Sequence, residues 1–389
     1  MAQVSRPEYK PELDGIRGIA ILGVLATHAA VGHPSFALRG YSKLVRYIFT
    51  PGWAGVDLFF VLSGFLITGI LLSTKASSNY FRSFYARRCL RIWPIYYVTL
   101  LGLAMIAIAF PSLAAIASSP GRFLASYFLY LQNVPAFLWH GQVGMLMGPF
   151  WSLAVEEQFY LVWPILVLLL NERALGWLCA AAFVLAIASR VYMVHIHGID
   201  FRVMMLTTSR LDGLIIGAAC ALFMHAQKRP VPLTWIAYAF AAGTAIIGYI
   251  ALFHRAELLG TAFYMHTIGV TGFALISGSL VAVSQYRFRV LQVPLTIPLL
   301  RSFGKYSYGI YVYHSIVFVV GTLVLQRVFR WELPASLPMS LLATAVMTAA
   351  TFAIAKLSYD HFEMRFLSLK RYFEPVVEKP VTETAPVEV

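Results

Sequence analysis

Charged residues are scarce in this 389-residue sequence, at 12% of the chain, whereas they make up about a quarter of a typical soluble domain. Acidic residues are the scarcer sign, with 17 Asp and Glu against 30 Lys and Arg. Hydrophobic residues make up 59%, and the mean hydropathy is +0.73. So little charge cannot cover a soluble globule with polar surface. The composition therefore excludes an ordinary soluble domain and indicates a polytopic membrane protein.

Cysteine is also rare, and Cys89, Cys179 and Cys220 have neither paired nor metal-type spacing. This excludes a disulfide framework and a cysteine-based metal site. We find no His, Asp and Glu cluster with metal-ligand spacing, no phosphate-binding loop and no dinucleotide fingerprint, so we expect no metal. The first 15 residues are polar and lack the apolar region of a cleavable signal peptide, so we expect the first helix to direct insertion.

The net charge of +13 raises the question of nucleic-acid binding. No compact basic domain is present to carry such a function. In membrane proteins, Lys and Arg accumulate in cytoplasmic loops. We therefore expect no nucleic-acid partner.

Long apolar segments recur along the chain, and each is long enough for a transmembrane helix of about 20 residues. They predict an all-α, polytopic membrane helix bundle of about ten transmembrane helices. The aromatic, proline-broken segment 122–140 is interpreted as interfacial or re-entrant, and there are eleven helices if it spans. The expected helices are 13–32, 53–73, 92–110, 150–170, 175–194, 206–226, 232–252, 262–284, 306–326 and 338–358.

Basic residues set the expected orientation. With ten helices, the side that holds both termini collects about twice as many Lys and Arg as the other, which predicts that both termini are cytoplasmic. We expect one membrane domain, residues 1–373. Residues 374–389 are rich in Pro, Val and Glu and are expected to form a disordered cytoplasmic tail.

Ionisable residues inside a bilayer are costly and are candidates for function. On the first helix, His28 lies eleven residues beyond Arg17, about 16 Å along the axis. The predicted orientation places Asp57, Glu156 and Glu157 at the depth of His28, near the outer face. A histidine beside carboxylates can act as a general base, so these four are the candidate catalytic residues. The alternatives are a hydrogen-bonded structural histidine and, for Asp57, a favourable charge at a helix N-terminus.

A second group of candidates concerns binding. Arg88 and Arg91 lie just before the third helix and share a helix face, so with Arg17 they could hold a polyanion, or they could serve only as topology determinants. Asp212 is a candidate substrate-binding residue, although it and Arg210 are also interpretable as a local ion pair.

His314 lies mid-helix with Tyr308 and Tyr311 on or near its face. We take Tyr311 and His314 as candidate substrate-binding residues. The alternative for His314 is a structural role, in which its ring only satisfies a hydrogen bond within the bundle.

The chain resembles acyltransferase family 3, integral membrane proteins that O-acylate saccharides and some other exported or hydroxylated molecules. The Arg-x10-His spacing is intact as Arg17 and His28, and the matching motifs occur in the family's order. After His314 the sequence departs from the aromatic-proline continuation that is frequent in the family. The motifs are ELDGIRGIAILGVLATHA (12–29), GVDLFFVLSGFLIT (55–68), FYARRCLRIWPIYY (84–97), WSLAVEEQFYLVWPIL (151–166), SRLDGLIIGA (209–218) and GKYSYGIYVYHS (304–315).

The resemblance implies a membrane O-acyltransferase, in the enzyme class that transfers groups other than aminoacyl groups. Acetyl-CoA or another acyl-CoA would be the cytoplasmic donor, and the acceptor would be a saccharide such as an exopolysaccharide or O-antigen. It implies a multi-pass protein of a bacterial inner (plasma) membrane, in contact with lipid and with a partner from glycan assembly. In that setting Arg17, Arg88 and Arg91 would bind the donor, and a glutamate or Asp57 would orient the His28 imidazole. The alternative function is a proton-coupled transporter or flippase.

Overall fold

The computed structural model describes residues 10–31, 48–109, 121–134, 146–254, 263–286, 288–327 and 337–376, which contain helices, turns and no strand. Within these ranges, nine helical stretches are long and apolar enough to cross a membrane, and α1 joins them as a further 21-residue helix. The long helices are α1 (Pro11–Val31), α3 (Gly55–Ser73), α4 (Tyr80–Ala109), α8 (Trp151–Leu169), α9 (Glu172–His197), α10 (Leu211–Gln227), α11 (Leu233–Phe253), α12 (Val270–Val283), α15 (Ser307–Arg327) and α16 (Leu337–Ser358). Each of the ten predicted segments coincides with one of them, so the prediction of a polytopic helical bundle is confirmed.

Shorter helices connect or extend the long ones. The short α-helices are α6 (Gly121–Phe128), α13 (Arg289–Leu295), α14 (Pro298–Lys305) and α17 (Met364–Ser368). The 3-10 helices are η1 (Thr50–Ala54), η2 (Gly148–Phe150), η3 (Phe201–Met205), η4 (Thr208–Arg210) and η7 (Leu369–Phe373), and the π-helical turns are η5 (Met265–Gly269) and η6 (Tyr359–Glu363).

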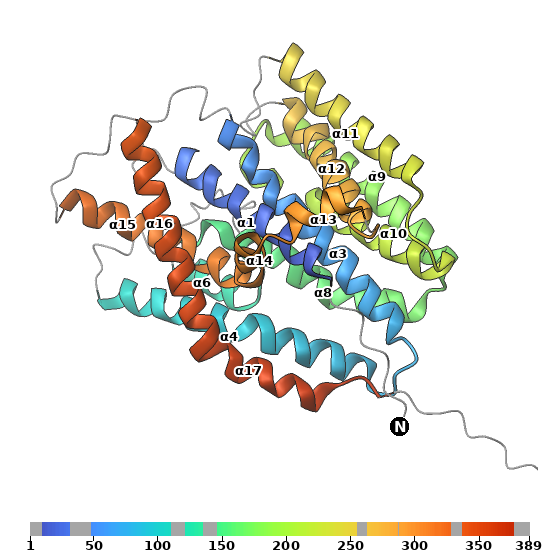
Figure 1. Ribbon diagram of the computed structural model, residues 1–389, viewed down its shortest axis with the longest axis horizontal. Coiled ribbons are helices and arrows are strands. Elements are labelled where there is room, and N and C mark those ends of the chain that lie inside the picture. The colour runs from blue at the N-terminus through green and yellow to red at the C-terminus, as the bar shows by residue number, and fades with distance from the viewer. Residues whose placement is uncertain are drawn as a thin grey trace, which may run out of the picture.

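Two helices start or stop differently from the prediction. The third long helix begins at Tyr80, twelve residues before the predicted start, so Arg88 and Arg91 lie inside α4 and not in front of it. Its first half, which carries four arginines among apolar residues, packs along α17 and η7 (Figure 1). In segment 122–140, α6 ends at Phe128 and is about 12 Å long, too short to span. Residues 135–140 of that segment lie outside the described residues.

The bundle is centred on α1, α3, α8 and α10 (Figure 1). In the close pair of α3 and α10, a Cβ at Gly217 would lie only 2.0 Å from the Val61 carbonyl oxygen, so only glycine allows this approach. Small residues spaced four apart, as Gly213 and Gly217 are, commonly allow such close helix packing. Helices α9, α11 and α12 cover one side, and α15 and α16 cover the other.

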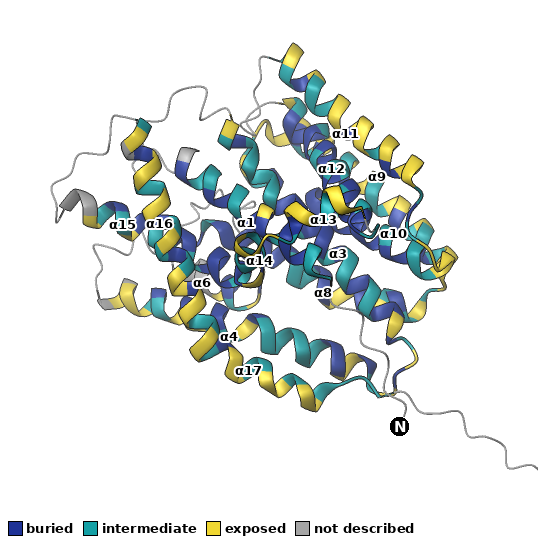
Figure 2. Cartoon of the chain, viewed as in Figure 1, coloured by how far each residue is buried: buried dark blue, intermediate teal, exposed yellow. Residues whose placement is uncertain are grey.

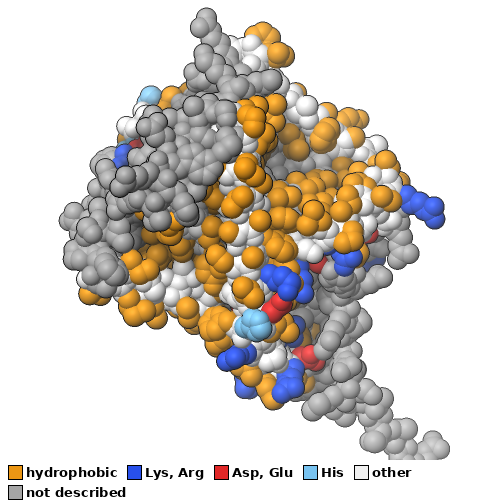
Figure 3. Space-filling model, turned by 60° about the vertical axis from the view of Figure 1, so that its left-hand side comes forward, with side chains coloured by type: hydrophobic (Ala, Val, Ile, Leu, Met, Phe, Trp, Pro, Cys, Tyr) orange, Lys and Arg blue, Asp and Glu red, His pale blue; other side chains and the backbone are white. Residues whose placement is uncertain are grey.

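The outer faces of the covering helices are apolar. Figure 2 shows buried residues concentrated in the central helices and exposed residues along α11 and α16. On α11, Tyr238, Leu252 and Phe253 are each more than 70% exposed. Figure 3 shows a broad hydrophobic surface with charged side chains gathered toward one end. A surface of this kind is suited to lipid.

Candidate active site

A cavity of about 110 Å³ lies between α1, α3, α4, α8 and α15, and we call it the inner cavity. Six of the ten predicted site residues line it, although they come from four different helices. They are Arg17, Arg88, Arg91, Glu156, Glu157 and Tyr311. The sequence predicted the two glutamates at the depth of His28, near the outer face, whereas the structure places them in one cavity with the three arginines.

Glu156 is held by hydroxyl groups on the wall of the inner cavity. Ser63 Oγ donates to Glu156 Oε1 at 2.6 Å and lies 2.8 Å from the Tyr160 hydroxyl. The Arg88 guanidinium lies over the Tyr160 ring, 5.6 Å from its centroid. The sequence analysis did not single out Ser63 or Tyr160. Their signal was weak, because a lone hydroxyl in an apolar helix is common.

Glu157 also lines the cavity, where Trp93 Nε1 donates to its Oε2 at 3.4 Å, which is a long bond. On the cavity side of α1, Arg17 Nη1 donates to Asp14 Oδ1 at 2.8 Å, and this bond fixes the guanidinium within one helical turn. Arg91 lies near enough to line the same space. Basic and acidic side chains therefore face one narrow cavity.

His28 and His314 lie against each other, with ring centroids 4.8 Å apart and ring planes at 70°. They belong to α1 and α15, which are almost 300 residues apart in sequence. The His314 ring is completely buried, and its centroid lies 5.5 Å from that of Tyr311, a residue that lines the inner cavity. The histidine pair is thus linked to the cavity through Tyr311.

Backbone carbonyls orient both imidazoles. His28 Nδ1 lies 2.8 Å from the Val24 carbonyl oxygen, and His314 Nδ1 lies 2.6 Å from that of Tyr311. A carbonyl can only accept, so Nδ1 carries the proton in each ring, and Nε2 of the neutral ring keeps its lone pair. A carboxylate was expected to orient His28. In the structure Val24 occupies that position, because an i−4 carbonyl lies within reach of a helical histidine.

Tyr311 is fixed at the cavity wall by its hydroxyl group. Tyr311 OH donates to the Pro149 carbonyl oxygen at 2.8 Å and lies 2.6 Å from Ser152 Oγ. Tyr308, on the same helix, donates to the Ile92 carbonyl oxygen at 2.7 Å. These bonds tie α15 to the start of α8 and to α4, so the cavity wall is rigidly connected to three helices.

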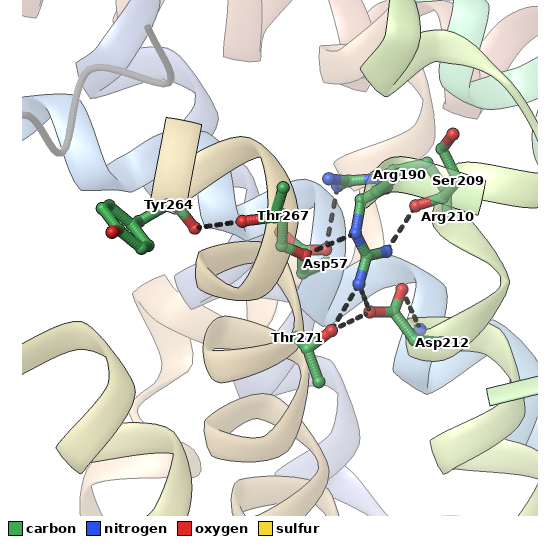
Figure 4. Close-up of polar contacts among 9 residues, drawn as sticks. Asp57, Arg190, Ser209, Arg210, Asp212, Tyr264, Thr267 and Thr271 are labelled. Atoms are coloured by element: carbon green, nitrogen blue, oxygen red, sulfur yellow. Dashed lines mark hydrogen bonds and ion pairs between the residues drawn. The ribbon is translucent and has the colours of Figure 1, made fainter. Parts of the chain in front are cut away.

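Asp57 and Asp212 lie in a separate buried network between α3, α9, α10 and α12 (Figure 4). Arg210 Nη2 donates to Asp57 Oδ1 at 2.8 Å. The Arg210 guanidinium also lies 5.5 Å from the ring centroids of both Phe60 and Trp151. Phe60 lines the inner cavity, so this ion pair supports the cavity wall.

Asp212 is paired with Arg190, at 2.8 Å between Oδ2 and Nη2. Arg190 also donates to the carbonyl oxygens of Ser209 at 2.6 Å and Thr267 at 2.9 Å, and to the Thr271 hydroxyl. The prediction of a local Arg210–Asp212 ion pair is therefore wrong. Arg210 pairs with Asp57 on α3, and Asp212 pairs with Arg190 on α9. Sequence reasoning missed Arg190, although a single arginine in the apolar stretch of α9 was a signal, because charges inside membranes are almost always partnered.

Metal ligation finds no support in the described parts of the chain, where no three His, Cys, Asp or Glu residues are grouped closely enough to hold an ion. The inner cavity offers carboxylates, hydroxyls and guanidinium groups, and the two imidazoles lie beyond Tyr311. Such a set can accept a proton and bind an anion.

Comparisons with known proteins identify the relatives of this chain. The model of a family described as an acyltransferase domain matches residues 10–357. The peptidoglycan O-acetyltransferase OatA of Listeria monocytogenes is 30% identical over 378 aligned residues, covering 92% of this chain and 55% of that protein. The putative peptidoglycan O-acetyltransferase YrhL of Bacillus subtilis is 28% identical over 333 residues, covering 81% and 49%.

A putative O-acetyltransferase of Staphylococcus aureus is 25% identical over 377 residues, covering 92% of this chain and 57% of that protein. The chain thus spans about half the length of these curated relatives. No solved structure matches the chain.

Proposed function

The chain belongs to acyltransferase family 3, and on this premise we propose that it transfers an acetyl group from acetyl-CoA to a hydroxyl group of a saccharide in the bacterial cell envelope. Two of the relatives above carry names that specify peptidoglycan as the molecule modified. A polymer of that class, or another glycan such as an exopolysaccharide or O-antigen, is the acceptor we propose.

The observation that carries this proposal is the inner cavity, where arginines and glutamates from separate helices face one space beside a histidine pair. Arg17, Arg88 and Arg91 would hold phosphate groups of the donor, because guanidinium groups bind phosphate bidentately. From Arg17, His28 is about 16 Å along α1. That length is comparable with the extended pantetheine arm that joins the phosphates to the thioester.

His28 would act as the general base. Its Nδ1 proton is donated to Val24, so Nε2 can accept the proton of the acceptor hydroxyl group. The bound donor supplies the activated thioester carbonyl. Direct transfer and a transient acyl-histidine both use the same nitrogen. Glu156, Glu157 and Asp57 remain candidate catalytic residues, and Asp212, Tyr311 and His314 remain candidate substrate-binding residues.

The proposed orientation places both termini and the arginines at the cytoplasmic face of the inner (plasma) membrane. The arginines that line the inner cavity then face the cytoplasm, where acetyl-CoA is made. His28 lies nearer the opposite face, where an envelope glycan is available. A partner from glycan assembly would deliver that glycan.

The test uses the purified chain in lipid nanodiscs, with acetyl-CoA labelled in the acetyl group and soluble peptidoglycan fragments as acceptor. His28→Ala should reduce acetyl transfer by at least the 10²- to 10⁴-fold typical of a lost general base. The control is His195→Ala, because His195 is exposed at the end of α9. Both variants should elute as folded protein on size exclusion.

Two outcomes would overturn the proposal. Turnover retained in His28→Ala would remove the assigned base. Glycan flux into liposomes without acetyl-CoA, together with no acetyl transfer by the unaltered chain, would favour the transporter.

A further inference from the structure

A second hollow, of about 810 Å³, lies next to the inner cavity, and we call it the outer hollow. Arg17, Arg91 and Tyr308 line both spaces, so the two meet at these side chains. Arg88, Glu156 and Glu157 line only the inner cavity. The outer hollow therefore adds a compartment that the sequence analysis did not assign.

Positive charge dominates the outer hollow. Five cationic side chains line it against two carboxylates, and one of these, Asp14, is already paired with Arg17 at 2.8 Å. A concave site with this excess of cations attracts a polyanion. The charged residues in its lining are Arg17, Arg91, Arg301, Lys305, Lys370, Asp14 and Glu363.

Close packing of α14 on α1 positions two of these cations. A Cβ at Gly304 would lie 1.8 Å from the Asp14 carbonyl oxygen, so the backbones of the two helices are in contact. Arg301 and Lys305 are four residues apart on α14 and share one face. That face is directed at the hollow that Arg17 lines from α1.

Aromatic rings stand beside the cations. Lys305 Nζ lies 5.0 Å from the ring centroids of both Tyr306 and Tyr359, and the two rings meet edge to face at 5.2 Å. Both tyrosines line the outer hollow. Cations next to an aromatic wall suit a ligand that combines phosphate groups with a flat heterocycle.

Hydrogen bonds from Asn79 and Ser83 hold the segment that carries Lys370. After η7, Asn79 binds the chain in both directions, with Nδ2 donating to the Glu374 carbonyl oxygen at 2.9 Å and Oδ1 accepting from Val376 N at 3.0 Å. Ser83 Oγ donates to the Phe373 carbonyl oxygen at 2.8 Å. This holds η7 against α4, so Lys370 is fixed at the wall of the hollow.

We propose that the outer hollow binds the 3′-phosphoadenosine end of coenzyme A, with Arg301, Lys305 and Lys370 as the residues that select the complete donor. The inference rests on the proposed function, because it assumes an acyl-CoA donor. The shared residues give the ligand a continuous route, with its nucleotide in the outer hollow and its thioester arm in the inner cavity. An anionic lipid head group has the same phosphate chemistry, but it does not need the connection to the inner cavity.

The test measures equilibrium binding of labelled coenzyme A to the purified chain in zwitterionic nanodiscs. The variants are Arg301→Ala with Lys305→Ala, and Lys370→Ala alone. Each lost charge-assisted contact should weaken binding by about tenfold or more. Arg371→Ala is the matched control, because Arg371 is the next residue, has the same charge and is absent from the hollow's lining. Its affinity for coenzyme A should equal that of the unaltered chain.

Truncated donors make the test sharper. In the unaltered chain, KM should rise from acetyl-CoA to 3′-dephospho-acetyl-CoA and again to acetyl-pantetheine. In the double variant these KM values should converge.

The failures are distinguishable. An unaltered chain that neither binds coenzyme A nor uses acetyl-CoA overturns the proposed function itself. If the unaltered chain uses acetyl-CoA but the variants keep its KM and affinity, only the outer-hollow assignment is overturned. The same conclusion follows if the variants change only the dependence of activity on anionic lipid, which would make the hollow a lipid site.

Discussion

Arg190 provides the sharpest test of what holds the bundle together. Its side chain has no exposed area, and it donates to the Asp212 carboxylate, two carbonyl oxygens and the Thr271 hydroxyl. In Arg190→Ala, Asp212 keeps only the Thr271 hydroxyl at 2.7 Å and the Gly213 amide at 3.1 Å, and its charge loses the compensating cation. Removing one partner of a buried ion pair typically costs about 3–5 kcal/mol.

That loss corresponds to roughly 150- to 5,000-fold in the unfolding equilibrium constant. It should be measured as the free energy of unfolding of the purified chain in mixed micelles, by titration with a denaturing detergent. Arg202→Ala is the matched control, because the Arg202–Asp200 ion pair is about one-quarter exposed. Such pairs contribute about 0–1 kcal/mol.

Replacing both partners distinguishes two contributions to the loss of stability: the missing hydrogen bonds and the unpaired charge of Asp212. Arg190→Met with Asp212→Leu should recover at least half of the loss, since apolar pairs of similar size often substitute for buried ion pairs. A loss below about 1 kcal/mol in Arg190→Ala would refute the reasoning. So would a double variant that is less stable than the single one.

Two further predictions concern the cavity and the packing of α14. Ser63→Ala removes the hydroxyl that binds Glu156, and it should lower kcat for acetyl transfer about tenfold with the fold intact; an unchanged kcat would show that Glu156 needs no such support. Gly304→Val must push α14 away from α1, and it should cost about 1–3 kcal/mol of unfolding free energy and weaken coenzyme A binding. Gly248→Val is its control, because no atom lies within 4 Å of a Cβ there, and equal effects in the two variants would contradict the packing argument.

The sequence predicts the helices well because a membrane span is a local property. Twenty apolar residues need a helix to satisfy their backbone groups, whatever their neighbours are. The start of α4 was missed because four arginines interrupt the apolar pattern of its first half, which packs against α17 and η7. The short helices α13 and α14 were also missed, because seven and eight residues carry too little periodicity to be recognised.

The partners of the site residues could not be predicted in the same way. Depth along a helix follows from counting residues, and it grouped Arg17 with Arg91 and Glu156 with Glu157. It placed the two groups at different depths, whereas both line the inner cavity. Depth does not tell in which direction around the helix axis a side chain points. Asp57 was expected at the depth of His28, but in the structure it is paired with Arg210.

His314 shows the same limit. The sequence placed it mid-helix, but its contact with His28 depends on how α15 packs beside α1. That information is distributed over many apolar contacts, none of which stands out in a single sequence.

The two buried ion pairs also impose an order on the assembly of the protein. Asp57 enters the membrane with α3, whereas its partner Arg210 is synthesised about 150 residues later. Arg190 on α9 finds its partner Asp212 on α10, the next long helix to be synthesised. A buried charge without its partner is costly, and these charges are buried although Asp57 and Asp212 lie in the first turns of α3 and α10. The arrival of α10 neutralises both charges at once, so it is the step that commits the earlier helices to their final places during biosynthesis.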